Sequence, residues 1–218
     1  MYEKLKEDVC RANIELQKQK LVILRWGNVS GIYREKSVIA IKPSGVPYNY
    51  LFPEKMVLLD IKGNIIGGNL RPSSDTLTHL ELYRNFEEIG GICHTHSTFA
   101  TMWAQACSEI PCFGTTHADH FYGPIPVTRF LREEEVKQGY ETNTGSVIVE
   151  RFANLNPLEV PGVLVAGHGP FTWGKTPEEA VENGLILEKV AQLALGTLNL
   201  NPKNILLPKY ILKKHYLR

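Results

Sequence analysis

The feature that most constrains the fold is the four-residue apolar run Val163–Ala166 and the helix signal that follows it. A continuous apolar run of this length is typical of a strand buried on both faces. The segment Thr176–Glu179 then supplies a capping box with proline at the first helical position, so a helix is expected from Thr176 to about residue 195. A buried strand followed by a helix indicates an α/β protein.

The rest of the chain repeats this alternation of short apolar runs and amphipathic segments. Strands are expected over residues 21–24, 37–41, 57–61, 64–66, 125–127 and 146–149. Helices are expected over residues 3–20, 75–89 and 132–139 and from residue 97 onward. Residues 25–31, rich in glycine and small polar side chains, are expected to form an exposed turn. From pattern alone, this alternation favours a doubly wound parallel sheet.

Length and charge limit the function classes. The 218 residues predict one domain over 1–218, and neither a repeat nor a linker divides them. A net charge of +1 gives no electrostatic reason to expect a nucleic acid or an anionic membrane as partner. No apolar run approaches the ~18 residues of a membrane span, and the charged N-terminus does not resemble a signal peptide. We therefore expect a cytoplasmic protein.

The segment Cys93–His96 is the first candidate for chemistry. If it lies on a strand, His94 and His96 point to the same face with Cα atoms roughly 6.6 Å apart, a spacing that suits two imidazoles on one cation. Two histidines on an exposed strand are an equally good interpretation of this pair alone. His168 favours the metal site, because it follows the apolar run 163–166 between two glycines. Three histidines with an open fourth position match a catalytic zinc or a similar divalent ion.

Two carboxylates and a fourth histidine are weaker candidates. Asp75, at the expected start of a helix, is either a further group of the metal site or an ordinary N-cap. Asp119, between His117 and His120, is suited to proton transfer or to hydrogen bonding within a loop. His79 is expected on the surface of its helix or behind the site.

Three short dipeptides are suited to holding an anion. Each combines small polar side chains or accessible backbone N–H groups at a junction between an element and a loop, and one precedes a helix N-terminus. They are Gly27-Asn28, Ser44-Gly45 and Ser73-Ser74. Neither a Walker nor a G-x-G-x-x-G motif occurs, so a nucleotide is not indicated.

These stretches, taken in order, resemble one known family. The chain is similar to the class II aldolases and epimerases, and within them to the L-ribulose-5-phosphate 4-epimerases, along nearly its whole length. The motifs that carry the resemblance are Gly27–Ser30, Lys42–Gly45, Arg71–Thr76, His94–Ser97 and Ala166–Pro170. Five motifs in the same order are far more specific than any one of them.

The resemblance implies a fold and an assembly. It implies a single three-layer α/β domain with a central, largely antiparallel sheet flanked by helices, which replaces the parallel sheet expected from pattern. It also implies a homotetramer with fourfold symmetry and active sites at the interfaces between subunits.

The resemblance also implies the roles of the candidate residues. His94, His96 and His168 would bind Zn2+, with Asp75 at the same site. The three dipeptides would hold a sugar-phosphate substrate, mainly by its phosphate. The implied reaction interconverts L-ribulose 5-phosphate and D-xylulose 5-phosphate by breaking and re-forming the C3–C4 bond, with zinc as Lewis acid. Asp119 would be the acid/base for the C4 hydroxyl.

Two relatives remain as alternatives, a fuculose-phosphate aldolase and a non-catalytic module like the adducin head. Aspartate at position 75, where those aldolases carry glutamate, and the segment Thr115–Asp119 favour the epimerase. The three histidines argue against the adducin-like module, which is expected to lack them. The epimerases also use a tyrosine in their C-terminal tail. The sequence ends at Arg218, apparently short of that tyrosine, and Tyr216 is not obviously its equivalent.

Overall fold

The structure is a computed structural model that describes residues 2–218. Over these residues the strands form one seven-stranded sheet in the order β4-β3-β2-β1-β5-β7-β6, and every neighbouring pair is antiparallel. The strands are β1 (Asn28–Tyr33), β2 (Val38–Ile41), β3 (Val57–Asp60), β4 (Ile65–Gly67), β5 (Gly91–His94), β6 (Gly162–Val165) and β7 (Gly169–Gly174). The antiparallel sheet expected from the family resemblance is confirmed, and the parallel sheet expected from pattern is wrong.

Short connections explain why the sheet is antiparallel. Residues 34–37 join β1 to β2, residues 61–64 join β3 to β4, and residues 166–168 join β6 to β7. Connections of three or four residues can join antiparallel neighbours, whereas a parallel pair needs a crossover of a dozen residues or more.

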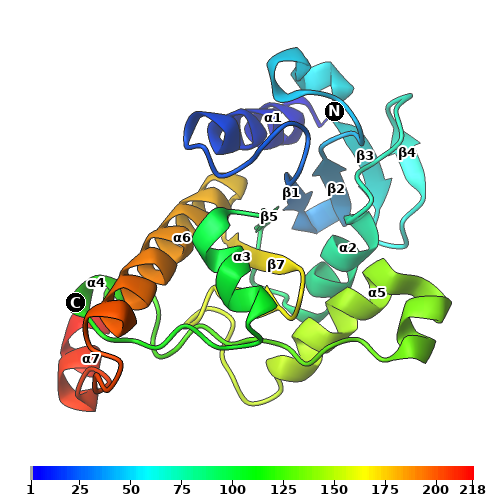
Figure 1. The fold of residues 1–218 in the computed structure, drawn as a ribbon. Helices are drawn as coiled ribbons and strands as arrows, with labels where there is room; N and C mark the ends of the chain where they lie inside the picture. Colours follow the sequence, from blue (N-terminus) through cyan, green and yellow to red (C-terminus); the bar gives the residue numbers. More distant parts are fainter. Residues whose placement is uncertain (1) are drawn as a thin grey trace.

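Helices cover both faces of the sheet. They are α1 (Glu3–Lys18), α2 (Thr76–Asn85), α3 (Thr98–Gln105), α4 (Thr115–Ala118), α5 (Glu133–Arg151), α6 (Pro177–Leu200) and α7 (Lys209–Tyr216). Figure 1 shows α1 and α6 on one side of the strands and α2 and α5 on the other. Within the described residues, no helix is long and apolar enough to cross a membrane.

The alternation of side chains along β1 assigns the two faces of the sheet. Val29 packs into the cluster formed with α1 and the start of α6, whereas Ile32 packs into the cluster that contains the apolar side chains of α2. Asn28 and Ser30 therefore lie on the α2 face. Asn28 of β1 is paired with His94 of β5 in the register of the sheet, so Asn28 and His94 lie at the same end of the sheet.

Several elements differ from the expectations. The segment expected to be an exposed turn contributes buried β1, and residues 21–24 do not form a strand in the described chain. Residues 146–149, expected to be a strand, belong to α5. The prediction failed because a short apolar run such as Val147–Val149 cannot be told from the buried face of a helix by periodicity alone. Strand β7 was not expected from the sequence.

Candidate active site

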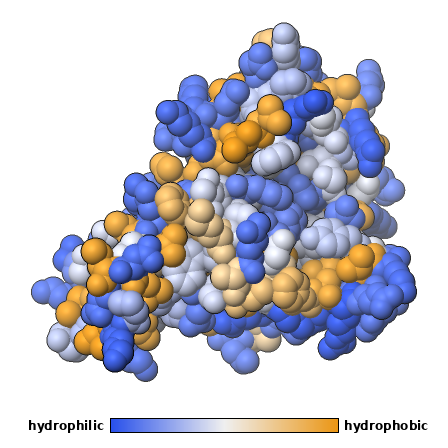
Figure 2. All heavy atoms as spheres, viewed as in Figure 1, coloured by the Kyte–Doolittle hydropathy of each residue, from blue (hydrophilic) through white to orange (hydrophobic). Residues whose placement is uncertain are grey.

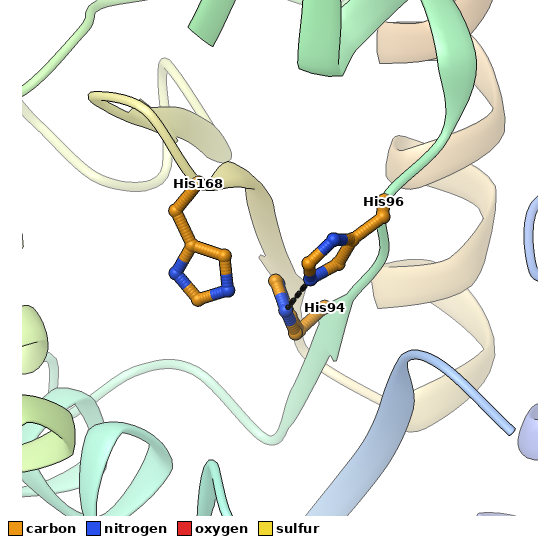
Figure 3. A group of neighbouring side chains, drawn as sticks. All are labelled: His94, His96 and His168. Carbon is orange, nitrogen blue, oxygen red and sulfur yellow. Dashed lines mark hydrogen bonds between the residues drawn. The ribbon is translucent and has the colours of Figure 1, made fainter. Parts of the chain in front are cut away.

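Three histidines from two segments converge at one end of the sheet. His94 is the last residue of β5, His96 follows in the loop to α3, and His168 lies in the turn between β6 and β7. Their ring centroids are 4.7–5.0 Å apart, and the Nε2 atoms of His94 and His96 are separated by 3.1 Å (Figure 3). Two nitrogens bound to one tetrahedral zinc at 2.0–2.1 Å would lie roughly 3.3 Å apart. The cluster therefore has dimensions that suit a divalent metal.

The route by which His96 joins the cluster differs from the expectation. Both histidines were expected on one strand, but β5 ends at His94. His96 reaches the site from the loop, and its ring lies on the exposed rim beside Trp26.

His94 is held in the form that a metal needs. Its Nδ1–H donates to the backbone carbonyl oxygen of Pro170 at 2.9 Å, and its ring stacks on Phe171 with centroids 4.1 Å apart. A histidine whose Nδ1 carries the proton presents the Nε2 lone pair to a ligand. The start of β7 thus both orients His94 and fixes its tautomer.

The other two rings are uncharged at neutral pH. Burial, with the neighbouring histidines, lowers the pKa of His168 to about 3. The same two causes lower the pKa of His96 to about 4. Neutral imidazole is the form that binds metal ions.

Asp75 faces this cluster and does not act as a helix cap. It occupies the N-cap position of α2, but in the described chain its side chain makes no capping hydrogen bond. Instead, Oδ2 accepts from Nδ2 of Asn28 at 2.6 Å. Burial disfavours its charge, but the attraction of His94 and His79 and the bond from Asn28 outweigh burial and hold the pKa of Asp75 below its usual range. Asp75 lines the same cleft, although among residues 2–218 the cluster of convergent ligand atoms comprises only the three histidines.

Gly27 permits the close approach of β1 to β5 at the site. Its φ of +76° is favourable only for glycine, and a Cβ there would lie 2.7 Å from the carbonyl oxygen of His94. A larger residue at this position would displace the strand that carries Asn28.

A cleft of about 410 Å³ opens beside the histidines. All six residues predicted to hold an anion line it, together with three that were not predicted. The six are Gly27, Asn28, Ser44, Gly45, Ser73 and Ser74. Two backbone hydrogen bonds, Ser44 N–H to Arg71 O at 2.9 Å and Ser73 N–H to Lys42 O at 3.0 Å, hold the two serine loops side by side.

The three residues that sequence reasoning missed are Arg25, Trp26 and Lys42. Lys42 is only 2% exposed, and its ammonium lies 4.8 Å from the ring centroid of Tyr48. Burial lowers the pKa of Lys42 to about 8, while the charge of Asp75 opposes the shift. The available signal was a lysine directly after the apolar strand 38–41. A buried lysine is costly unless an opposite charge pairs with it, so a lysine at this position is a candidate for binding an anionic ligand.

Asp119 lies outside this cleft. It ends α4, where its Oδ1 is 2.8 Å from Nδ1 of His215 on α7. It lines a separate cavity with Gly174, at the opposite end of β7 from His168. A six-residue strand spans roughly 17 Å, so one chain does not bring Asp119 to the three histidines. Figure 1 shows α4 beside α7, at one extremity of the molecule.

His79 is fully buried, which rules out the surface position that the sequence allowed. Its Nδ1 lies 2.6 Å from the hydroxyl oxygen of Ser30, which lies 2.8 Å from that of Tyr83. Burial lowers the pKa of His79 to about 3. Within residues 2–218, its Nε2 has no hydrogen-bond partner. His79 therefore belongs to a polar row behind Asp75, between α2 and β1.

Together, the antiparallel sheet between helices and the histidine cluster beside a cationic cleft define an α/β protein with a candidate metal centre. The model of the family described as Class II Aldolase and Adducin N-terminal domain matches residues 7–195. The chain therefore belongs to the class II aldolase and adducin family.

Solved structures share the fold along nearly the whole chain. An L-fuculose 1-phosphate aldolase is 24% identical with a TM-score of 0.82, covering 97% of this chain and 94% of its own. The L-fuculose 1-phosphate aldolase from Glaciozyma antarctica PI12 is 19% identical with a TM-score of 0.79, covering 99% and 81%. YgbL from Klebsiella pneumoniae is 24% identical with a TM-score of 0.77, covering 98% and 99%. At these identities the likeness establishes the fold alone.

Proposed function

We propose that this protein is a zinc-dependent L-ribulose-5-phosphate 4-epimerase, which interconverts L-ribulose 5-phosphate and D-xylulose 5-phosphate. The observation that carries the proposal is the convergence of three imidazoles at the edge of a cationic cleft. Aspartate at position 75, and Asp119 within the segment Thr115–Asp119, favour the epimerase over an aldolase of the same family.

His94, His96 and His168 would hold the metal. Their fit rests on three imidazole nitrogens within 4.8 Å of one another and on the tautomer that Pro170 imposes on His94. When bound, zinc supplies a Lewis acid that polarises the substrate carbonyl and so weakens the C3–C4 bond. Asp75, held by Asn28, places a negative charge beside the same centre.

The cationic end of the cleft would hold the substrate phosphate. The Lys42 ammonium and the Arg25 guanidinium supply charge, while the hydroxyls and backbone N–H groups of the serine loops supply hydrogen bonds. Ser73 and Ser74 precede α2, whose N-terminal dipole favours an anion. Binding the phosphate here fixes the distance between the sugar carbons and the histidines.

Asp119 would act in the site of a neighbouring copy. Inversion at C4 requires that the aldehyde fragment rotate and be attacked on its other face. The C4 hydroxyl proton is therefore removed on one face of the fragment and returned on the opposite face, which needs an acid/base group on each side. The roughly 17 Å length of β7 excludes Asp119 from the cleft of its own chain. A second copy that contributes its α4 and α7 to this cleft would supply the missing carboxylate.

Exposed apolar side chains support an assembly through this end of the molecule. Leu200, Ile205 and Tyr210 are 76–91% exposed. Figure 2 shows apolar side chains gathered at this extremity, over α7 and the end of α6. Isolated exposed apolar residues are ordinary, but a group of this kind marks an interaction surface. We propose a homotetramer in which this end of each subunit covers the metal cleft of the next.

Incubation of the zinc-loaded protein with 13C-labelled L-ribulose 5-phosphate tests the activity. NMR should show D-xylulose 5-phosphate accumulating to equilibrium, without lasting release of glycolaldehyde phosphate. Failure to form D-xylulose 5-phosphate, together with rapid cleavage of L-fuculose 1-phosphate, would assign an aldolase instead. A protein purified without chelator that contained no divalent metal would overturn the proposed centre as well.

A further inference from the structure

Tyr140 stands on the outer side of the histidine cluster. Its hydroxyl oxygen lies 3.4 Å from Nδ1 of His168, slightly beyond the roughly 2.7–3.2 Å of most N–H···O bonds, and the two ring centroids are 6.0 Å apart. Figure 3 shows one nitrogen of His168 turned toward His94 and His96 and the other, Nδ1, on the far side of the ring. The nitrogen beside Tyr140 is thus the one that would not touch a metal.

A break in α5 places this tyrosine at the cleft. Gly139 has φ +157° and ψ +95° within an otherwise helical segment. Three side chains then hydrogen-bond the carbonyls of successive residues around the break. Asn143 donates to Gly139 O at 3.0 Å, Thr144 donates to Tyr140 O at 2.8 Å, and Thr78 of α2 donates to Glu141 O at 2.7 Å.

This anchoring indicates that the position of Tyr140 is built into the fold. A break in a helix frees the carbonyls before it, which then need other donors. Asn143 also donates to Glu135 O, one turn before the break, at 2.8 Å, so side chains of α5 and α2 tie both sides of the break together. The result is a half-exposed phenol in a fixed position beside His168.

We propose that Tyr140 is a positioning residue of the metal centre, whose hydroxyl accepts the Nδ1–H of His168 and thereby turns the Nε2 lone pair toward the metal. The inference rests on the proposed three-histidine centre. It assigns to His168 the kind of partner that the carbonyl of Pro170 provides for His94. Histidine ligands commonly donate their second ring N–H in this way, and loss of the acceptor weakens metal affinity about 10–100-fold.

Tyr140→Phe tests the inference, because it removes the hydroxyl and keeps the ring. The zinc dissociation constant of metal-stripped protein, measured by competition with a chromophoric chelator, should rise at least about tenfold. Tyr33→Phe is the matched control, since Tyr33 is 41% exposed against 38% for Tyr140 and also makes one side-chain hydrogen bond, to Glu35. Its zinc affinity should not change. A Tyr140→Phe affinity within about twofold of the unmodified protein would overturn the inference.

A second variant tests whether the position of the Tyr140 hydroxyl, and not only its presence, determines the zinc affinity. A Cβ at Gly139 would have Thr142 as its nearest neighbour at 3.9 Å, so Gly139→Ala acts only through the backbone conformation. It should weaken zinc binding while the hydroxyl is still present, and it should add little to the loss in Tyr140→Phe, because both changes break one interaction. Fully additive losses would contradict the inference. If no variant and not even the unmodified protein bound zinc, the metal centre itself would be wrong.

Discussion

If the active site is shared between copies, two inactive variants should restore each other. His96→Asn removes a proposed metal ligand from one cleft, and Asp119→Asn removes the proposed acid/base group at the other end of the same chain. Asp119→Asn alone should lose about 10²- to 10⁴-fold in turnover, the usual contribution of a general acid or base. His96→Asn alone should abolish turnover, because it removes a proposed ligand of the catalytic metal. Their far-UV circular dichroism should not change, because His96 is exposed and Asp119 is half exposed.

The expected recovery follows from the geometry. A working site needs an intact His96 from one copy and an intact Asp119 from the next. When the two variants are produced together in equal amounts and assort at random in a closed ring, about one quarter of the sites meet both conditions. The mixed protein should therefore recover roughly a quarter of the unmodified activity for D-xylulose 5-phosphate formation.

A second mixture provides the control. A chain that carries both substitutions, co-produced with unmodified chain, should also give about one quarter if the site is shared, but about one half if each chain contains a whole site. Recovery no greater than the summed activity of the two single variants would refute the shared site. Undiminished turnover of Asp119→Asn would refute the role of this carboxylate.

Three further changes have expected outcomes. Because burial lowers the pKa of Lys42 to about 8, KM for the sugar phosphate should rise as pH increases through 8 and the ammonium loses its charge. Lys42→Arg should flatten that rise, as measured by initial rates from pH 7 to 9.5, and an unaltered profile would contradict phosphate binding by this residue. Burial lowers the pKa of His117 to about 4, so the unfolded chain takes up a proton first as pH falls from 6.5. That uptake should cost about 3 kcal/mol of unfolding free energy by pH 4, and His117→Gln should abolish this part of the loss in urea titrations. Gly27→Ala should destabilise the fold by more than about 1–2 kcal/mol, because a positive φ and the contact with His94 O are both unfavourable. A melting temperature equal to that of the unmodified protein would refute that account of the loop.

Much of the architecture was predictable where local pattern and tertiary environment agree. The buried run that became β6, the capping box before α6 and the helix after Asp75 appear at nearly the expected residues. The expectation failed for β1 and β7. Glycine and small polar residues suggested a turn where β1 forms, and β7 was not expected at all. Pairing with β5 on both sides supplied the backbone hydrogen bonds that stabilise these two segments as strands.

The residues of the cleft were predictable to a similar extent. Histidines and paired serines are informative by type and spacing, so His94, His96, His168 and the three dipeptides that line the cleft could be named in advance. Tyr140 carries no comparable signal, because its relevance depends on the break at Gly139 and on the position of α5 against α2.

What the sequence determined by itself is the chemistry on offer: three histidines beside glycines, small polar turns at strand ends, and a family resemblance strong enough to overrule a parallel sheet. Only the tertiary structure decided which of these groups meet. It turned Asp75 from a helix cap into a partner of Asn28, buried Lys42 beside the serines, and placed Asp119 at the far end of β7. The physical reason is that side-chain type and local periodicity are properties of neighbouring residues, whereas burial, pKa and distance depend on packing between segments far apart in the chain.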